Sequence, residues 1–249
     1  MTNRIIYRRR FFVVSTLLLA LFCQGTFDRA KADSVRTPKG DAPMIHWAIL
    51  ESTPGEMTQM QALARELVAP RVAHEPGTYA LYGGVDASNP NRLYLLEIYR
   101  DEDAYEIHVG SDEFKEYKAR RANILKELVI LPVQPIALEQ KVGEGTEIWA
   151  RNVVVSKDAA KEYGERIRRE AIEAVRRDDG VMGFFVTQDD ETGVFWILEA
   201  FRNSAARTAY RESSEYRAFR RDVDPLELRN DEWKLNAGVM TLSDKYREK

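Results

Sequence analysis

The stretch LLEIYRDEDAYEIHVGSDEFKEY at residues 95–117 recurs in diverged form as ILEAFRNSAARTAYRESSEYRAF at residues 197–219. The two stretches align without a gap at an offset of 102, and six of their 23 positions are identical. Average residue usage would give roughly one or two identities by chance. The identical pairs are Leu96/Leu198, Glu97/Glu199, Arg100/Arg202, Ala104/Ala206, Ser111/Ser213 and Glu113/Glu215. The chain is therefore predicted to contain two diverged copies of one domain.

Both copies show the same order of hydrophobic periodicities, which predicts a βαββαβ fold for each. In the first copy we expect strands at 45–51, 78–85, 92–99 and within 127–141, and helices after Pro54-Gly55 and from residue 101, the latter interrupted near 110–111. In the second copy we expect strands at 147–155, within 181–201 and at 232–242, a helix that starts near Ser156 as N-cap, and a helix that ends at about residue 223. This order is the ferredoxin-like α+β arrangement, with two helices on one face of an antiparallel sheet.

The strands carry apolar residues on both faces, so the face without helices must also be buried. At residues 95–99, Leu95, Glu97 and Tyr99 share one face while Leu96 and Ile98 share the other. We therefore predict that the two sheets pack face to face within the chain, as an intrachain pseudo-dimer with a barrel-like core.

The N-terminal residues 1–32 have the three parts of an export signal. Arginines precede an apolar run of twelve residues, which is short for a bilayer-spanning helix of about 20 residues. A small-x-small pattern at residues 30–32 predicts a mature start at Asp33. The export route is either the general secretory one or, given RRRFF at residues 8–12, the twin-arginine one. The mature protein is expected outside the cytoplasm, in the periplasm, or held by an N-terminal membrane anchor if the signal is not cleaved.

The predicted organisation is a signal peptide at 1–32, a linker at 33–43, a first domain at 44–141, a second domain at 147–242 and a C-terminal tail at 243–249. The leader holds six of the basic residues, which leaves 31 basic and 39 acidic residues in the remainder. An acidic body without a basic tract argues against nucleic acid as a partner. The single cysteine excludes an internal disulfide, and the three histidines show no metal-ligand spacing.

The motifs GTYALYG, LYLLEIYRDEDAYEIH and SDEFKEY resemble the antibiotic biosynthesis monooxygenase (ABM) domain family. The resemblance covers residues 44 to about 141, and residues 147–242 look like a degenerate second copy. The resemblance implies a dimeric α+β barrel. It also implies one of two activities, the cofactor-independent oxygenation of phenolic or quinol compounds or the degradation of haem. Many members of the family have no assigned activity.

His108 is the candidate catalytic residue, because a neutral imidazole can accept a proton from a hydroquinone hydroxyl. The second copy has Tyr210 at the equivalent position, which assigns any chemistry to the first copy. The alternative role of His108 is a structural one, bonded to a neighbouring group.

Further side chains are expected to hold an aromatic substrate. Glu97 would bind a substrate hydroxyl or, alternatively, pair with an arginine across the sheet interface, as would Glu199. The tyrosines would stack on the ring or, alternatively, pack the core. The candidate binding residues are Tyr82, Tyr99, Tyr105, Glu97, His46 and Trp47, with Tyr79 nearby.

The leading hypothesis is an exported oxygenase that uses O₂ and a small aromatic substrate, without metal or other cofactor, and acts as a monomer. The rival is a non-catalytic binding or structural module. Haem degradation is a third reading, although Lys118 and Arg220 stand where haem-degrading relatives carry a ligand histidine, and only Asn152 resembles their strand asparagine.

Overall fold

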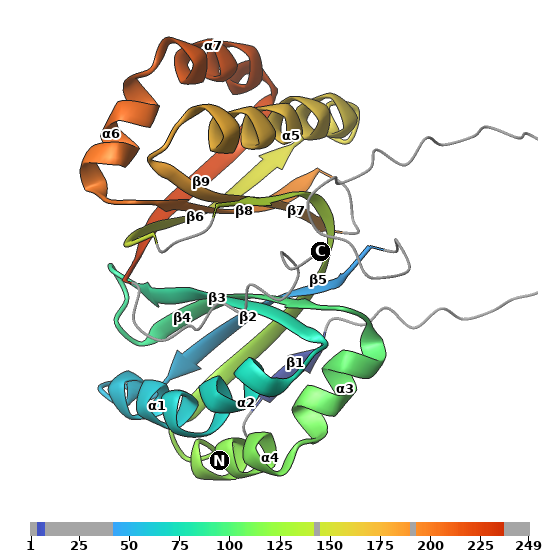
Figure 1. The fold of residues 1–249 in the computed structure, drawn as a ribbon, viewed down its shortest axis with the longest axis vertical. Coiled ribbons are helices and arrows are strands. Elements are labelled where there is room, and N and C mark those ends of the chain that lie inside the picture. The colour runs from blue at the N-terminus through green and yellow to red at the C-terminus, as the bar shows by residue number, and fades with distance from the viewer. Residues whose placement is uncertain (1–3, 8–41, 142–144, 190–192, 237–249) are drawn as a thin grey trace, which may run out of the picture.

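The computed structural model describes residues 4–7, 42–141, 145–189 and 193–236, and it contains two α+β units stacked sheet to sheet (Figure 1). In the first unit the strands are β2 (Met44–Ser52), β3 (Thr78–Asp86), β4 (Arg92–Tyr99) and β5 (Leu125–Gln140). Its helices are α1 (Met57–Leu63), α2 (Ala69–His74), α3 (Glu102–Gly110) and α4 (Asp112–Arg120), with a π-helical turn at Ala64–Val68 between α1 and α2.

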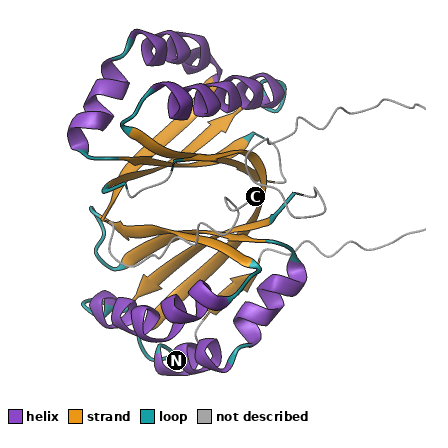
Figure 2. Cartoon of the chain, in the orientation of Figure 1, coloured by secondary structure: helices purple, strands orange, loops and turns teal. Residues whose placement is uncertain are grey.

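The second unit repeats this order. Its strands are β6 (Glu147–Val155), β7 (Val181–Asp189), β8 (Val194–Phe201) and β9 (Glu227–Asn236). Its helices are α5 (Ala160–Arg177), α6 (Ser204–Glu212) and α7 (Ser214–Val223), followed by a 3-10 turn at Asp224–Leu226. In both units the helices lie on the outer face of the sheet, and the two sheets face each other (Figure 2).

Strand pairing closes the two sheets into one barrel. The strand order is β1-β5-β2-β4-β3-β9-β6-β8-β7, where β1 spans Arg4–Tyr7, and a further pairing of β5 with β7 closes the sheet. The long strand β5 makes this seam, because it pairs with β2 up to Val133 and with β7 from Val133 onward. The opposite seam between β3 and β9 is shorter, with Val85 opposite Asn236 and Asp86 opposite Leu235. The predicted intrachain pseudo-dimeric barrel is thus confirmed.

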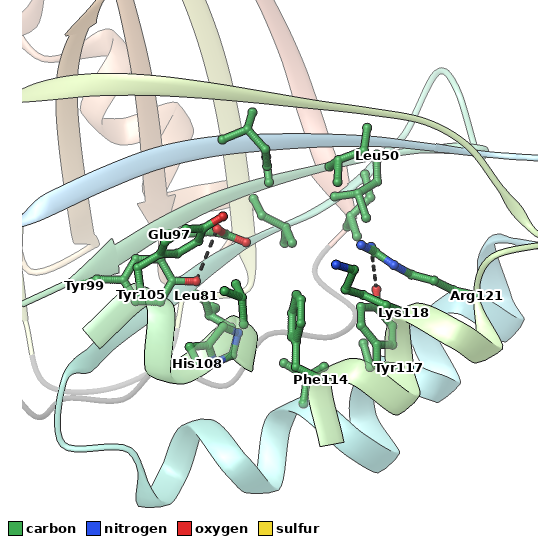
Figure 3. A pocket seen from close by; sticks show the side chains of 18 residues that line it. Leu50, Leu81, Glu97, Tyr99, Tyr105, His108, Phe114, Tyr117, Lys118 and Arg121 are labelled. Carbon is green, nitrogen blue, oxygen red and sulfur yellow. Dashed lines mark hydrogen bonds between the residues drawn. The ribbon is translucent and has the colours of Figure 1, made fainter. Parts of the chain in front are cut away.

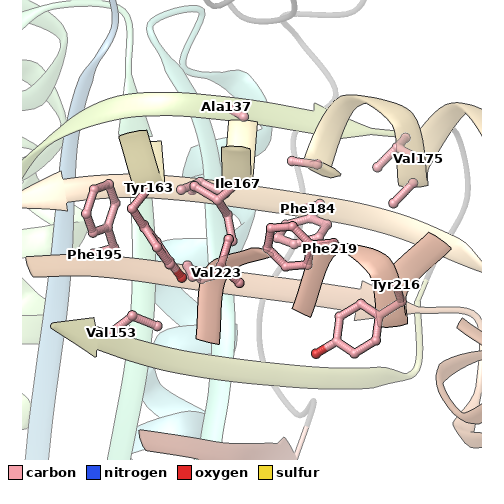
Figure 4. Close-up of a cluster of buried hydrophobic side chains, with 14 of the residues drawn as sticks. Ala137, Val153, Tyr163, Ile167, Val175, Phe184, Phe195, Tyr216, Phe219 and Val223 are labelled. Carbon is pink, nitrogen blue, oxygen red and sulfur yellow. The ribbon is translucent and has the colours of Figure 1, made fainter. Parts of the chain in front are cut away.

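The strand faces divide the core into three clusters, as alternation along the strands requires. Leu96 and Ile98 point into the barrel with apolar residues from both units, whereas Leu95 and Tyr99 point to the helices of the first unit. A third cluster lies between α5, α7 and the sheet of the second unit (Figure 4). The outer face of each sheet is buried by the helices of its own unit, and the inner face is buried by the sheet of the other unit.

The positions repeated in the sequence have repeated structural roles. Gly77 and Gly180 precede equivalent hairpins, and a Cβ on either would lie only 2.4 and 2.5 Å from the Cβ atoms of Ala104 and Ala206. Only glycine allows the helix to approach so closely. Ser111 and Ser213 each break the helical segment, and their side chains accept hydrogen bonds from Phe114 and Tyr216 backbone N–H groups, at 3.2 and 3.1 Å, to begin the next helix.

Two boundaries differ from the prediction. Ser156 accepts a hydrogen bond from the Ala159 N–H at 3.3 Å, but it caps a turn, and α5 begins only at Ala160. β9 begins at Glu227 rather than at residue 232, and residues 237–242 of the predicted strand lie outside the described residues.

Residues 4–7 of the predicted leader form β1 (Arg4–Tyr7), which runs parallel to β5. The rest of the leader, the linker up to residue 41 and the C-terminal tail lie outside the described residues. Among the described helices, none combines the length and the hydropathy needed to span a bilayer.

Candidate functional site

A cavity of about 150 Å³ lies between the sheet and the helices of the first unit (Figure 3). Its walls are mostly apolar, and its polar residues form two groups. Glu97, Tyr99, Tyr105 and His108 belong to one group, and Tyr117, Lys118 and Arg121 belong to the other. The apolar lining residues are Ala48, Leu50, Ala64, Val68, Leu81, Leu93, Leu95, Val109, Phe114, Leu128 and Ile130.

The local sequence explains why helical packing leaves space here. Pro70 has no backbone N–H, so a continuous α-helix from α1 into α2 would lack one hydrogen bond at this residue. The π-helical turn at Ala64–Val68 lies directly before α2. Ala64 from this turn and Ala48 from β2 present only methyl groups to the cavity. The sequence analysis did not predict the π-helical turn.

His108 lies on α3 with only 2 % of its surface exposed, and its Nδ1 atom is 2.7 Å from Glu75 Oε2. Glu75 also accepts hydrogen bonds from Thr78 Oγ1 at 2.7 Å and from Arg71 Nε at 3.0 Å. Burial acts to raise the pKa of Glu75, but the bonds from His108, Thr78 and Arg71 outweigh it and lower the pKa to about 2.

An ionised Glu75 can only accept hydrogen bonds, so it assigns the proton of a neutral His108 to Nδ1. The Nε2 atom then carries the lone pair, and no described residue bonds to it. Because His108 lines the cavity, Nε2 is the ring nitrogen available to a ligand. Glu75 was not among the predicted site residues, although its position before the Pro-Gly break was visible in the sequence.

Glu97 and Tyr99 lie two residues apart on β4 and face the cavity, and the Tyr99 hydroxyl donates to Glu97 Oε2 at 3.3 Å. Burial raises the pKa of Glu97, and the neighbouring His108, the hydrogen bond from Tyr99 and the charge of Arg121 oppose this only in part. Burial, reinforced by the charge of Glu97, also raises the pKa of Tyr99. Tyr99 therefore stays a hydrogen-bond donor at neutral pH.

The aromatic rings around His108 form a continuous edge-packed set. Tyr105 lies 5.3 Å from Tyr99 between ring centroids, and His46 lies 5.1 Å from Tyr105. His46 is buried beside these rings but does not line the cavity. His74, in contrast, is exposed at the end of α2.

Three of the residues considered as substrate-binding lie on the other side of the sheet. Tyr82, Trp47 and Tyr79 belong to the apolar cluster inside the barrel. Tyr79 joins Tyr82 there although the two are three residues apart, because the register of β3 shifts between Thr78 and Ala80. Trp47 Nε1 donates to Thr187 Oγ1 of the second unit at 3.0 Å, and Tyr82 bonds to Gln140. The prediction that these side chains share a cavity with His108 does not match their positions; they pack the interface between the units.

In the described part of the second unit, side chains fill the positions that line the cavity of the first. Tyr210, at the position of His108, is fully buried and donates to Glu170 Oε1 at 2.9 Å. Glu199, at the position of Glu97, pairs with Arg151 at 3.4 Å and with Arg211 at 3.2 Å. Both arginines belong to the same unit, so the predicted pairing across the sheet interface is wrong for Glu199. For Glu97, the described residues include no cation within salt-bridge distance.

Comparison with known proteins identifies the same two repeated domains in the sequence. The sequence profile described as antibiotic biosynthesis monooxygenase matches residues 45–120 and again residues 150–222. The chain belongs to the ABM family. Both copies are therefore ABM domains, as the resemblance implied, and no curated protein matches the sequence significantly.

Solved structures share the two-unit arrangement of this ABM protein. The putative monooxygenase from Lactobacillus acidophilus NCFM superimposes with a TM-score of 0.76 at 14 % identity, over 82 % of this chain and 97 % of that one. The corresponding protein from Fusobacterium nucleatum gives 0.74 at 15 % identity, over 81 % and 94 %. An anthrone oxidase-like protein gives 0.54 at 11 % identity, over 82 % and 94 %. At these identities the likeness establishes the fold alone.

Proposed function

We propose that this ABM protein is a cofactor-independent monooxygenase that oxygenates a small phenolic or quinol compound in the cavity of the first unit. The observation that carries the proposal is the His108–Glu75 pair, whose second imidazole nitrogen faces a mostly apolar cavity. An apolar protein cavity of roughly 150 Å³ is large enough for benzene. The cavity therefore fits one aromatic ring better than a polycyclic substrate.

In this proposal His108 is the general base. Its Nε2 accepts the proton of a ring hydroxyl, while Glu75 holds the imidazole in the required tautomer and stabilises the imidazolium that forms. Glu75 does not touch the substrate and is a positioning residue. The apolar walls keep water away from the phenolate, which strengthens its interaction with the imidazolium.

The reaction balances without an added reductant. A hydroquinone phenolate gives one electron to O₂, and the resulting radicals combine to form a carbon–oxygen bond. This peroxide takes the proton held by His108. The C–H bond at the same ring carbon then breaks together with the O–O bond, so that one oxygen stays on the ring as a carbonyl and the other leaves as water with the ring proton. The products are a hydroxyquinone and one water, and the substrate supplies all four electrons that O₂ accepts.

A second candidate is a non-catalytic binding or structural role. The bond between His108 and Glu75 connects α3 to the end of α2, so it would also stabilise the fold without any chemistry. No other titratable group hydrogen-bonds to the imidazole within the described residues, which favours this candidate.

Oxygen uptake separates the two candidates. The purified protein is incubated with a panel of hydroquinones beside the His108→Ala variant, with His74→Ala as a control that removes an exposed histidine. General-base catalysis typically contributes 10²–10⁴-fold, so His108→Ala should lower the rate by about 100-fold or more while His74→Ala leaves it unchanged. Absence of uptake, or equal uptake by His108→Ala, refutes the base role.

Haem degradation has weaker support. Lys118 lines the cavity where haem-degrading relatives carry their ligand histidine, and an ammonium group does not ligate iron. Asn152 lies on β6 of the second unit and accepts a hydrogen bond from Arg229 at 2.7 Å. Haem titration decides the point, because this reading requires a Soret shift.

We further propose that the protein is an exported monomer. The two ABM domains already form the barrel that other members build from two chains. A mass measurement in solution should give a single chain, and fractionation of the producing cells should place the protein outside the cytoplasm. A stable dimer, or a cytoplasmic location, would contradict these two expectations respectively.

A further inference from the structure

Arg121 gives the cavity a positive end that the oxygenation chemistry does not use. It follows α4 and is only 6 % exposed, yet it lines the cavity. Its guanidinium lies over the Tyr117 ring at 4.5 Å, and its Nη1 donates weakly to the Tyr117 hydroxyl at 3.4 Å. Among the described residues, no carboxylate lies within salt-bridge distance of it.

A buried guanidinium without a carboxylate partner is unusual, because removing its charge from water is costly. Arg151, which is also buried, has in contrast Glu199 at 3.4 Å and Glu227 at 3.9 Å. The guanidinium of Arg121 instead packs against the face of the Tyr117 ring and also lines the cavity. A second cation, Lys118, lines the same end and is itself exposed, so this end lies toward solvent (Figure 3).

The same positions of the second unit carry no such pair. At the offset of the repeat, Val223 replaces Arg121 and is fully buried among apolar side chains. Arg220 replaces Lys118 and forms a salt bridge with Glu227 at 2.8 Å. Among the described residues, these two positions therefore carry cations without a salt-bridge partner in the unit that has the cavity, and not in the other.

We propose that Arg121 and Lys118 bind an anionic substituent of the substrate, so that the cavity selects a single-ring phenol that bears a carboxylate or a similar small anion. The planar guanidinium matches a carboxylate in two parallel hydrogen bonds. The ring then lies among the apolar walls, with its hydroxyl toward His108 and Glu97 (Figure 3). The inference deepens the proposed function by naming the substrate class of the same cavity.

The test compares an acid with its neutral counterpart by calorimetry without O₂, using 2,5-dihydroxybenzoate and 2,5-dihydroxybenzamide. Hydrogen bonds to charged groups contribute enough for roughly tenfold or more in affinity, so the acid should bind at least that much tighter. Arg121→Gln should remove the preference, and Arg121→Lys should keep part of it. Arg120→Gln is the matched control, because Arg120 is the exposed neighbour that pairs with Glu66 outside the cavity.

Equal binding of acid and amide by the unchanged protein overturns the inference, and so does a preference that persists in Arg121→Gln. If Arg121→Gln fails to fold, the acid-to-amide ratio of the unchanged protein and of Arg121→Lys still decides. The anaerobic measurement separates this inference from the proposed oxygenation. Preference for the acid with no O₂ uptake refutes only the oxygenase, whereas uptake with neutral hydroquinones and no preference refutes only the anion site.

Discussion

Ala48 and Arg151 occupy the same position on the equivalent strands β2 and β6, where they lie opposite Leu95 of β4 and Ile197 of β8. Ala48 lines the cavity of the first unit, whereas Arg151 is completely buried in the second. The long side chain fills the second unit at this position and brings its charge to Glu199 and Glu227. One substitution between the repeats therefore accounts for much of the difference between an open unit and a closed one.

Enlarging Ala48 should close the first cavity as well. We predict that Ala48→Leu lowers the affinity for a single-ring ligand at least tenfold and leaves the fold intact, because added methyl groups fill space that is already apolar. Calorimetric titration with 2,5-dihydroxybenzoate and a thermal melt check both parts. Ala73→Leu, at an exposed position of α2, is the matched control. Undiminished binding by Ala48→Leu would show that the ligand does not enter this cavity.

Removing Arg151 should destabilise the protein severely. Arg151→Ala leaves Glu199 fully buried without this partner and opens a hole in the second unit. Breaking a buried ion pair in this way costs about 3–5 kcal/mol. Urea unfolding measures the loss, with Arg166→Ala as control, since Arg166 pairs with Glu162 on the protein surface. Similar unfolding midpoints for the two variants would show that the buried network contributes little.

Much of this architecture was predictable from the sequence. The repeat at residues 95–117 and 197–219 fixes two units, and the alternation of Leu95, Leu96 and Glu97 on a strand fixes which residues face the helices. Those two facts together require the sheets to pack against each other. The first and last residues of helices and strands were less predictable. Ser156 accepts the hydrogen bond expected of an N-cap, but this bond closes a turn, and α5 begins only after that turn.

The site was predictable only in part. His108 was predicted because a neutral imidazole can accept a proton, Glu97 because a carboxylate can bind a hydroxyl, and Tyr99 because its ring can stack on a substrate; all three line the cavity. Glu75 was missed because its role depends on a contact with His108, 33 residues away in the sequence. Arg121 was missed because its role depends on the cavity that it lines. Neither kind of contact leaves a periodic pattern in the sequence. Trp47 and Tyr82 were misplaced because aromatic side chains on these strands serve the barrel core as readily as a pocket.

The Glu75 carboxylate should make stability depend on acid pH. Its pKa is about 2 in the folded protein, below the ordinary 4.5, so the unfolded chain binds the proton more tightly. The stabilisation is complete above pH 4.5 and is lost as the pH falls toward 2. We predict that Glu75→Gln flattens the decline of the unfolding free energy in this window, by at most about 1.4 kcal/mol per pH unit.

Denaturant unfolding at several pH values between 5 and 2.5 measures this slope, with Glu113→Gln on the exposed surface of α4 as control. The control should follow the unchanged protein over the whole range. If Glu75→Gln declined as steeply as the unchanged protein, the His108–Glu75 bond would not hold the carboxylate in its ionised form.

The bond between Trp47 and Thr187 should couple the stabilities of the two units. Trp47 Nε1 donates to Thr187 Oγ1 at 3.0 Å across the barrel, and Thr187 in turn donates to the Trp196 carbonyl at 2.9 Å. Thr187→Val leaves the indole N–H buried without its partner, at a cost of about 1–3 kcal/mol. Trp47→Phe removes the donor but also some volume, so neither variant alone isolates the hydrogen bond.

A double-mutant cycle isolates the bond. We predict that Thr187→Val costs clearly less in a Trp47→Phe background than in the unchanged protein, with a coupling energy on the order of 1 kcal/mol. Both variants should unfold in a single urea transition, because the inner face of each sheet is buried only against the other unit. Purely additive effects would show that this hydrogen bond contributes no coupling energy. Two separate transitions would show that the units unfold independently.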